Sequence, residues 1–457
     1  SIGRVVTESS PRVDTGVTCA GRIVWTPFIH TDMRTLPFSL LALCVVACSD
    51  DSTSPATPIT YPLKAVDAAP TTWGTLNGVT IAGGYGSALA LDPTDPAVFW
   101  IMTDRGPNTT TPVANRLLFP LPNFTPVLAK FRLSGDSLRR VSTIELKNAA
   151  GINISGRPNP AGVGATGETG IDGSGATIPT DPDGLDSEGL AVESNGSFWV
   201  SDEYGPHIVH FDASGRTLER INPFGNGTGG RRLPAVLALR RPNRGMEGLA
   251  ITPDGRTLVG AMQSPLDNPT TAIGRASNAY RIITFDIASG ATKTFVYEAD
   301  AVGNIVSEIT AISATSFLVI ERDGLFQGGS PAAVSKRVYR IDLANATDVG
   351  DAANASTGKL FGGKVLEALT PAERASNAIT PVSKSLVYDL LTLPGGYPHD
   401  KLEGVTLIGK DLLVVSNDDD FGVVDGGASN FVSKILPATQ LRDRVVLYFI
   451  RLSTPLR

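Results

Sequence analysis

The chain repeats a hairpin pattern of apolar and polar positions. In its clearest copy, Leu185–Pro206, an apolar run at 190–192 is followed by the turn signal Ser194-Asn195-Gly196 and a second apolar run at 198–200. Short apolar runs separated by such a turn signal are typical of a β-hairpin. We therefore predict two antiparallel strands in this stretch.

Four other stretches share this pattern. Each has an acidic or small polar residue, an apolar strand, a turn, a second apolar strand and a polar cluster; the five copies begin at Ser87, Glu188, Glu247, Glu308 and Glu403. Glu188 and Glu247 are 59 positions apart, and Glu247 and Glu308 are 61 apart. Repeated units at this period predict an all-β fold, a β-propeller of four-stranded blades whose first strands line a central channel.

The number of blades is predicted to be five or six. Five inner hairpins are clear, and a sixth blade would have to combine residues 61–82 with the last strand, 445–452, so that the two ends close the ring. Long loops interrupt the strands, and the Gly-rich segment 148–182 runs directly into the hairpin at Glu188. Loops of this length are functional or disordered, and we expect this one to form a flap over the channel mouth.

Composition limits the class of protein. A 457-residue chain with a formal net charge of −6 is a poor match for nucleic acid. Four histidines in the whole chain argue against a histidine-rich zinc site. We expect a monomer with one large folded domain over 61–457.

The N-terminal region has the features of an export signal. Starting at Met33, the sequence MRTLPFSLLALCVVAC has one basic residue, a short apolar run and a cysteine, Cys48. It resembles the bacterial lipoprotein signal, in which the cysteine is lipidated and becomes the mature N-terminus. On this interpretation residues 1–32 are a non-native upstream extension, 33–47 the signal peptide and 48–60 a disordered tether. The chain would then be exported and held on a membrane, in the periplasm or at the cell surface, through the lipid alone. The alternative is a buried helix or strand.

Carboxylates gather at one end of the predicted hairpins. Asp186 and Glu188 stand at the start of one strand, and Asp202 and Glu203 at the end of the next. In an antiparallel hairpin these positions are neighbours, and grouped carboxylates repel one another unless a cation lies among them.

Oxygen ligands without cysteine or histidine suit Ca²⁺ or Mg²⁺. The equivalent glutamates of successive blades should converge on one axis, so we predict these metal ligands: Glu188, Glu247, Glu308, Glu403, Asp202, Asn417 and Asp418. The alternative is that each glutamate caps backbone groups or bonds the neighbouring blade, and that Asp418 belongs to a solvated loop.

Basic residues beside the acidic positions could bind an anionic substrate. Arg105, Arg244 and Lys401 each lie next to an acidic position of a repeat, and arginine can hold a phosphate or carboxylate with two hydrogen bonds. The alternative is an internal salt bridge to the neighbouring carboxylate.

Several motifs together resemble one family. They are GLDSEGLAVESNGSFWVSDEYGP, RPNRGMEGLAITPDGRTLVGAMQSPL, ERDG, KLEGVTL and NDDDFG, spread in order from Gly83 to the C-terminus. They resemble the bacterial phytase-like domain family, described by an esterase-like activity of phytase. The resemblance implies a secreted or surface propeller, calcium-dependent, that acts on phosphate esters.

These inferences lead to one main hypothesis. A bound Ca²⁺ neutralises a phosphate ester, Arg105, Arg244 and Lys401 hold its other oxygens, and Glu203 acts as the base. A gluconolactonase-like lactonase and a non-catalytic, lipid-anchored binding propeller remain as alternatives. No G-x-S-x-G elbow, P-loop or H-E-x-x-H motif occurs in the sequence.

Overall fold

A computed structural model describes residues 59–456. The predicted segments 1–32 and 33–47, the lipidation site Cys48 and nearly all of the tether 48–60 lie outside these residues. Within 59–456, no helix is long and apolar enough to cross a membrane.

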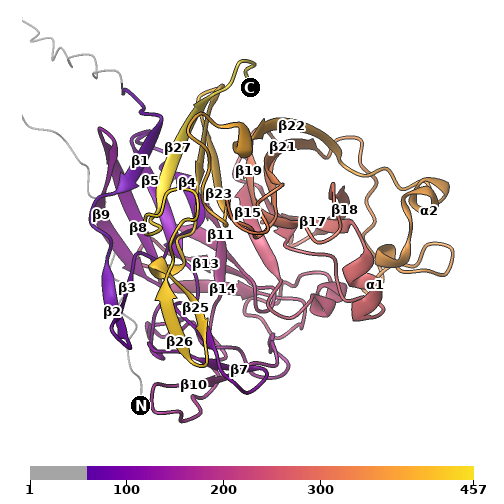
Figure 1. The fold of residues 1–457 in the computed structure, drawn as a ribbon. Coiled ribbons are helices and arrows are strands. Elements are labelled where there is room, and N and C mark those ends of the chain that lie inside the picture. Colours follow the sequence, from indigo (N-terminus) through magenta and orange to yellow (C-terminus); the bar gives the residue numbers. More distant parts are fainter. Residues whose placement is uncertain (1–58, 457) are drawn as a thin grey trace, which may run out of the picture. The chain divides into compact units, whose positions relative to one another are not determined.

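Within the described residues, three four-stranded sheets form one blade each, and one eight-stranded sheet contains two further blades of four strands. Figure 1 shows how the blades are arranged. The first blade contains β4 (Tyr85–Leu91), β5 (Val98–Thr103), β8 (Val127–Ser134) and β9 (Ser137–Glu145), and the second contains β11 (Ser187–Val192), β12 (Phe198–Asp202), β13 (Ile208–Phe211) and β14 (Thr217–Ile221). The third blade contains β15 (Met246–Ile251), β16 (Thr257–Met262), β17 (Ala279–Asp286) and β18 (Thr292–Glu298), and the fourth contains β19 (Ile305–Ala311), β20 (Ser316–Arg322), β21 (Lys336–Asp342) and β22 (Ser383–Asp389). The fifth blade contains β23 (Gly404–Ile408), β24 (Leu412–Ser416), β27 (Val446–Arg451) and β1 (Lys64–Asp67).

The first strands of the five blades surround one axis. Each of β4, β11, β15 and β19 packs beside the next, and β23 packs against β19 and β4. A cavity of about 250 Å³ at their far ends is lined by residues of all five, and Figure 1 shows these strands gathered in the middle of the described chain. The predicted β-propeller is confirmed.

The ring closes within its fifth blade. β1, from the start of the described chain, pairs antiparallel with the last strand, β27, with Lys64 opposite Tyr448. On its other edge β1 runs parallel to β9 of the first blade, with Val66 opposite Ser137. The choice between five and six blades is thus resolved as five, because residues 61–82 supply one strand of the fifth blade and a separate hairpin, β2 (Thr72–Leu76) and β3 (Val79–Ala82).

Small elements gather at one end of the blades (Figure 1). They are the sheet of β6 (Thr109–Thr110), β7 (Arg116–Leu118) and β10 (Thr169–Ile171), the hairpin of β25 (Val423–Gly427) and β26 (Asn430–Ser433), and the β2–β3 hairpin. Thr109 Oγ1 donates a hydrogen bond to Asp425 Oδ1 at 2.6 Å and joins the first two. Short helices occupy other loops: α1 (Thr271–Ala276), α2 (Pro371–Ser376), and the 3₁₀ turns η1 (Ala235–Leu239), η2 (Leu366–Ala368), η3 (Leu390–Thr392) and η4 (Asp420–Gly422).

Second strands are apolar on both faces because each blade is packed between two others. In β5 every residue is buried. Phe99 and Ile101 face the cluster shared with the fifth blade, whereas Trp100 and Met102 face the cluster shared with the second blade. Alternate residues of a strand point to opposite faces, so continuous apolar runs mark strands with two buried faces.

We predict that Ala65→Asp destabilises the fold much more than Lys64→Asp. Ala65 is fully buried among residues of β27 and β9, whereas Lys64, its neighbour on the same strand, is exposed. An unpaired charge in an apolar core costs several kcal/mol, so urea unfolding should show a loss of about 3 kcal/mol or more for Ala65→Asp and less than about 1 kcal/mol for the control. Equal effects would mean that β1 does not close the ring.

Candidate functional site

A cavity of about 310 Å³ opens at the end of the propeller where the inner strands begin. Its wall combines loops after β5, β12 and β24 with the start of β11, because the start of each first strand lies beside the end of the second. The lining contains six acidic and two basic residues: Asp104, Asp186, Glu188, Glu203, Asp420 and Asp425, with Arg105 and Lys401.

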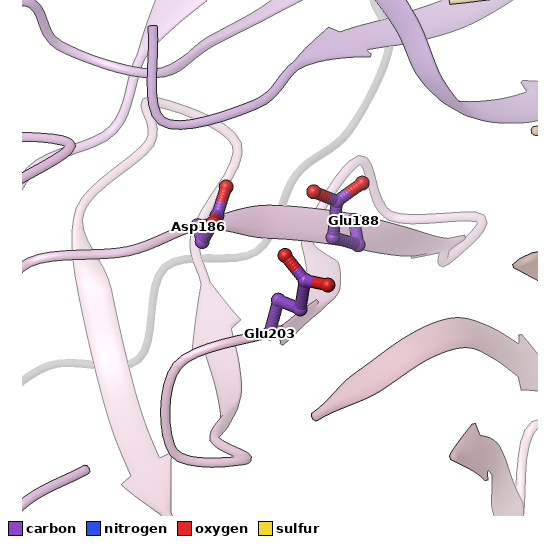
Figure 2. A group of neighbouring side chains, drawn as sticks. All are labelled: Asp186, Glu188 and Glu203. Carbon is purple, nitrogen blue, oxygen red and sulfur yellow. The ribbon is translucent and has the colours of Figure 1, made fainter. Parts of the chain in front are cut away.

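Three carboxylates of one hairpin face a common space (Figure 2). Asp186, Glu188 and Glu203 each offer an oxygen, and these oxygens all lie within 4.8 Å of one another. Asp186 precedes β11 and Glu203 follows β12, next to the paired residues Ser187 and Asp202. The hairpin pattern predicts that four carboxylates gather here. The structure brings these three together, and Asp202 is not among them.

Glu188 has no partner within residues 59–456. Its side chain is 7% exposed, yet its carboxylate makes no hydrogen bond or ion pair there. By contrast, Asp186 Oδ1 accepts from the Arg105 backbone N–H at 3.2 Å, and Glu203 Oε1 accepts from Gln263 Nε2 at 2.7 Å. A buried carboxylate without a partner needs either a proton or a cation.

Local backbone geometry aims the inner-strand glutamates. The strand register shifts at or beside Glu188, Glu247 and Glu308, and such a β-bulge turns a side chain away from its regular direction.

The glycine that follows two of these glutamates allows neighbouring blades to approach. A Cβ on Gly189 would lie 2.4 Å from the backbone nitrogen of Leu249, and one on Gly248 would lie 2.5 Å from that of Ile309. The Glu-Gly pair therefore places the carboxylate beside a close approach of two inner strands.

The other ring glutamates have partners of their own. Glu247 Oε2 accepts from Gln263 Nε2 at 2.6 Å, and Glu403 pairs with Arg322. Glu308 Oε1 accepts from two backbone N–H groups, Ile309 at 2.8 Å and Leu249 of the neighbouring blade at 3.3 Å. These contacts match the structural alternative for Glu308, while a metal role for all three stays a prediction.

Asp202 and Asn417 hold backbone groups and lie outside the cavity lining. Asp202 accepts from the N–H of Asp186 at 2.8 Å and of Gly205 at 2.7 Å. Asn417 accepts from the N–H of Val446 at 2.9 Å. Their metal-ligand role stays a prediction, and in the structure both side chains accept hydrogen bonds that hold the backbone in place.

Lys401 is surrounded by carboxylates at the cavity edge. Its Nζ lies 2.8 Å from Asp418 Oδ2 and 2.7 Å from Asp420 Oδ1. A second ammonium, that of the buried Lys434, lies 2.6 Å from the other oxygen of Asp420. Asp418 therefore lies in an internal ion-pair network, and not in a solvated loop.

The predicted arginines lie in different places. Arg105 lines the cavity, where its Nη1 contacts Glu168 Oε2 at 2.9 Å and Asn243 Oδ1 at 3.2 Å. Glu168 belongs to the segment 148–182, which is thereby joined to the site. Arg244 instead donates to Gln263 Oε1 at 2.8 Å and borders a separate cavity.

Burial and mutual repulsion control the protonation of these groups. Burial, followed by the charge of Glu247, raises the pKa of Glu188 and of Glu203 well above the ordinary range. Burial, followed by Glu403, raises the pKa of Glu247 to about 8. Burial opposes ionisation of Asp420 too, but Lys401 and Lys434 lower its pKa. Without a cation, several of these carboxyls hold protons near neutral pH.

Sequence reasoning passed over some residues of the site. Asp186 is predicted to gather with the other hairpin carboxylates but is absent from the predicted metal ligands, because it stands two positions before the repeated glutamate, Glu188. Gln263 bonds both Glu203 and Glu247, and its place in the polar cluster after β16 was the available signal. Asp104 belongs to the polar cluster that follows the first hairpin. Asp425 reaches the cavity from β25, an added strand that the repeat pattern does not mark.

One curated relative and several solved structures are similar to this chain. An "Uncharacterized secreted protein" of Arthroderma benhamiae is 31% identical over 192 residues, and the match covers 34% of this chain and 37% of that protein. The chain thus spans little more than a third of the length of this relative.

A protein from Lactobacillus plantarum has 12% identity and a TM-score of 0.32, covering 82% of this chain and 91% of that one. Regucalcin from Agrobacterium tumefaciens, a calcium-binding protein, has 10% identity and a TM-score of 0.36, covering 87% and 96%. Alignments this loose say nothing about a shared site.

The family profile described as "Phytase-like: Esterase-like activity of phytase" matches residues 80–421. This span runs from β3 to η4 and contains the inner strands of all five blades and the three carboxylates of the cavity. The chain therefore belongs to the phytase-like family.

Proposed function

We propose that this chain is an exported hydrolase of small phosphate esters that depends on a divalent cation, Ca²⁺, held by Asp186, Glu188 and Glu203. One observation carries the proposal: three buried carboxylates with oxygens within 4.8 Å of one another line the acidic cavity. One of them, Glu188, has no other partner among the described residues.

The donor set suits a hard cation. Ca²⁺ prefers carboxylate and carbonyl oxygens and tolerates irregular geometry, and the group contains oxygen donors from acidic side chains alone. When bound, the cation would neutralise the anionic ester and polarise its phosphorus–oxygen bonds.

The basic residues of the cavity would orient the ester. Arg105 and Lys401 border the same space as the three carboxylates. Arg105 is held in place by Glu168 and Asn243 and by the rings of Phe119 and Tyr204. A guanidinium held in this way binds oxyanions at little entropic cost.

Glu203 is better placed as a ligand than as a base. The sequence suggests it as the base, but its carboxylate is one of the three that could contact the cation. Its other contact, Gln263, donates to one oxygen and leaves the second for the cation.

Export is supported by the relative described as secreted. Anchoring through lipid at Cys48 remains a proposal from the sequence. The small anionic substrate follows from the basic residues and the predicted cation together.

We expect calcium to stabilise the wild-type protein against heat and to restore phosphatase activity after EDTA treatment. A ligand that binds the folded state alone adds about 2.7 kcal/mol at a hundredfold excess over its dissociation constant. Glu188→Gln should lose both effects, because an amide is a weaker ligand than a carboxylate. Melting curves and an aryl-phosphate assay measure the two effects.

Glu308→Gln is the matched control for this experiment. It makes the same change on a neighbouring inner strand, where the retained carbonyl oxygen can still accept from Ile309 and Leu249. It should keep the calcium response. No calcium response in the wild type would refute the cation site, and hydrolysis of a lactone without phosphatase activity would favour the lactonase instead. A calcium shift with no hydrolysis would favour a binding propeller.

We predict that Glu247→Gln reduces the loss of stability of the metal-free protein as pH rises. In the unfolded chain Glu247 ionises near its ordinary 4.5, whereas folding raises its pKa to about 8. A raised carboxyl pKa favours the folded state at low pH, and this contribution is lost as pH rises from about 5 to about 8. Urea unfolding in EDTA at several pH values should show a shallower decline for the variant; equal slopes would contradict the assignment.

A further inference from the structure

A second, smaller cavity of about 90 Å³ lies beside the acidic one and is bordered by three arginines. They are Arg241 and Arg244, before β15, and Arg275, in the last turn of α1. Ser264 and Tyr280 also border it. Nothing in the function proposed above uses this cavity.

A tight turn separates the two cavities. The Arg244 N–H donates to the Arg241 carbonyl at 3.0 Å, and Asn243 between them has a φ of 55°. Such a turn, with Pro242 at its second position, brings its first and fourth residues within about 7 Å. Asn243 lines the acidic cavity and contacts Arg105, while Arg241 and Arg244 line the other.

Within residues 59–456, none of the three arginines makes an ion pair with an acidic side chain. Weaker charge interactions link Arg241 to Asp267, and Arg244 to Glu203 and Glu247. Arg244 donates to the neutral Gln263, and neither Arg241 nor Arg275 makes an ion pair there. Burial, followed by the charges of Arg244 and Arg275, lowers the pKa of Arg241.

Four buried arginines elsewhere in the described chain differ in this respect, whereas the buried Arg220 and Arg240 donate to backbone carbonyl oxygens. Arg105, Arg281, Arg322 and Arg374 are buried, and each pairs with a glutamate. Positive groups that converge on a cavity without a carboxylate attract an anion.

We propose that Arg241, Arg244 and Arg275 form an oxyanion site for a phosphate, sulfate or carboxylate group of a small ligand. At about 10–15 Å³ for each water, the cavity has room for several waters, and so for one such group. Ser264 supplies a hydroxyl at its border. The group is either a free oxyanion or a second anionic group of the substrate; the latter rests on the proposed function.

The first test measures binding of inorganic phosphate to the purified chain in EDTA at low ionic strength by calorimetry. We expect one site in the wild type. The double variant Arg241→Gln/Arg275→Gln should bind about tenfold more weakly or worse, because two charge-assisted contacts are lost.

Arg256→Gln is the matched control. Arg256 is exposed in the turn at the other end of the same β15–β16 hairpin, so this variant loses a positive charge away from the cavity. It should bind phosphate as the wild type does. Absence of binding in the wild type, full binding by the double variant, or an equal loss in Arg256→Gln would each overturn the proposal. Melting curves without phosphate check that the variants are folded.

A second measurement identifies the source of the oxyanion. Propane-1,3-bisphosphonate is titrated with and without Ca²⁺. A substrate subsite predicts binding tighter than that of inorganic phosphate only with Ca²⁺, and loss of this advantage in the double variant. If the cation site fails but the arginine site is correct, the advantage disappears and phosphate binding in EDTA stays, which shows a site for free oxyanions.

Discussion

Repulsion among carboxylates that converge on one axis is the constraint to which this end of the propeller is adapted. Four blades contribute a glutamate at the same position, and loops add aspartates around them. Most of these groups are neutralised or bonded. Glu403 pairs with Arg322, Asp420 lies between two lysines, and Glu308 accepts backbone N–H groups. The hairpin of the second blade is where this compensation is incomplete, and the three carboxylates there form the candidate site.

The packing that builds the ring also brings these carboxylates together. Neighbouring inner strands approach so closely that a side chain on Gly189 or Gly248 would overlap the backbone of the next blade. The bulge beside the glycine points the preceding glutamate toward its counterparts. Because the inner strands lie so close, the side chains at the equivalent position of each blade also lie near one another. Where these side chains are carboxylates, the stability of the fold depends on the groups that pair with them.

Loops turn this acidic ring into a cavity with distinct sides. The segment 148–182 reaches it through Glu168 and Arg105, and the β25–β26 hairpin closes another side. The turn from Arg241 to Arg244 presents an asparagine to the acidic cavity and two arginines to its neighbour. The acidic cavity and the arginine-bordered cavity thus lie on the two sides of one turn. This arrangement suits a ligand that contacts both the proposed cation and the basic side chains.

The sequence by itself determined the repeat, the propeller and the gathering of carboxylates at one end of the second-blade hairpin, because strand alternation and hairpin pairing are local consequences of residue order. Three of the four predicted carboxylates, Asp186, Glu188 and Glu203, lie together in the structure. The sequence also indicated which acidic and basic residues are candidates for the site. It could not determine which of these side chains remain without a hydrogen-bond or ion-pair partner in the folded chain. Asp202 and Asn417 hold backbone groups, and Lys401 is engaged by Asp418 and Asp420, through contacts made between distant segments.

The number of blades was likewise decided by tertiary structure, since the five-bladed ring depends on β1 pairing with a strand from the other end of the chain. Local patterns specify elements and their repeats, whereas partners, charge compensation and closure depend on segments far apart in sequence that meet only in the folded chain.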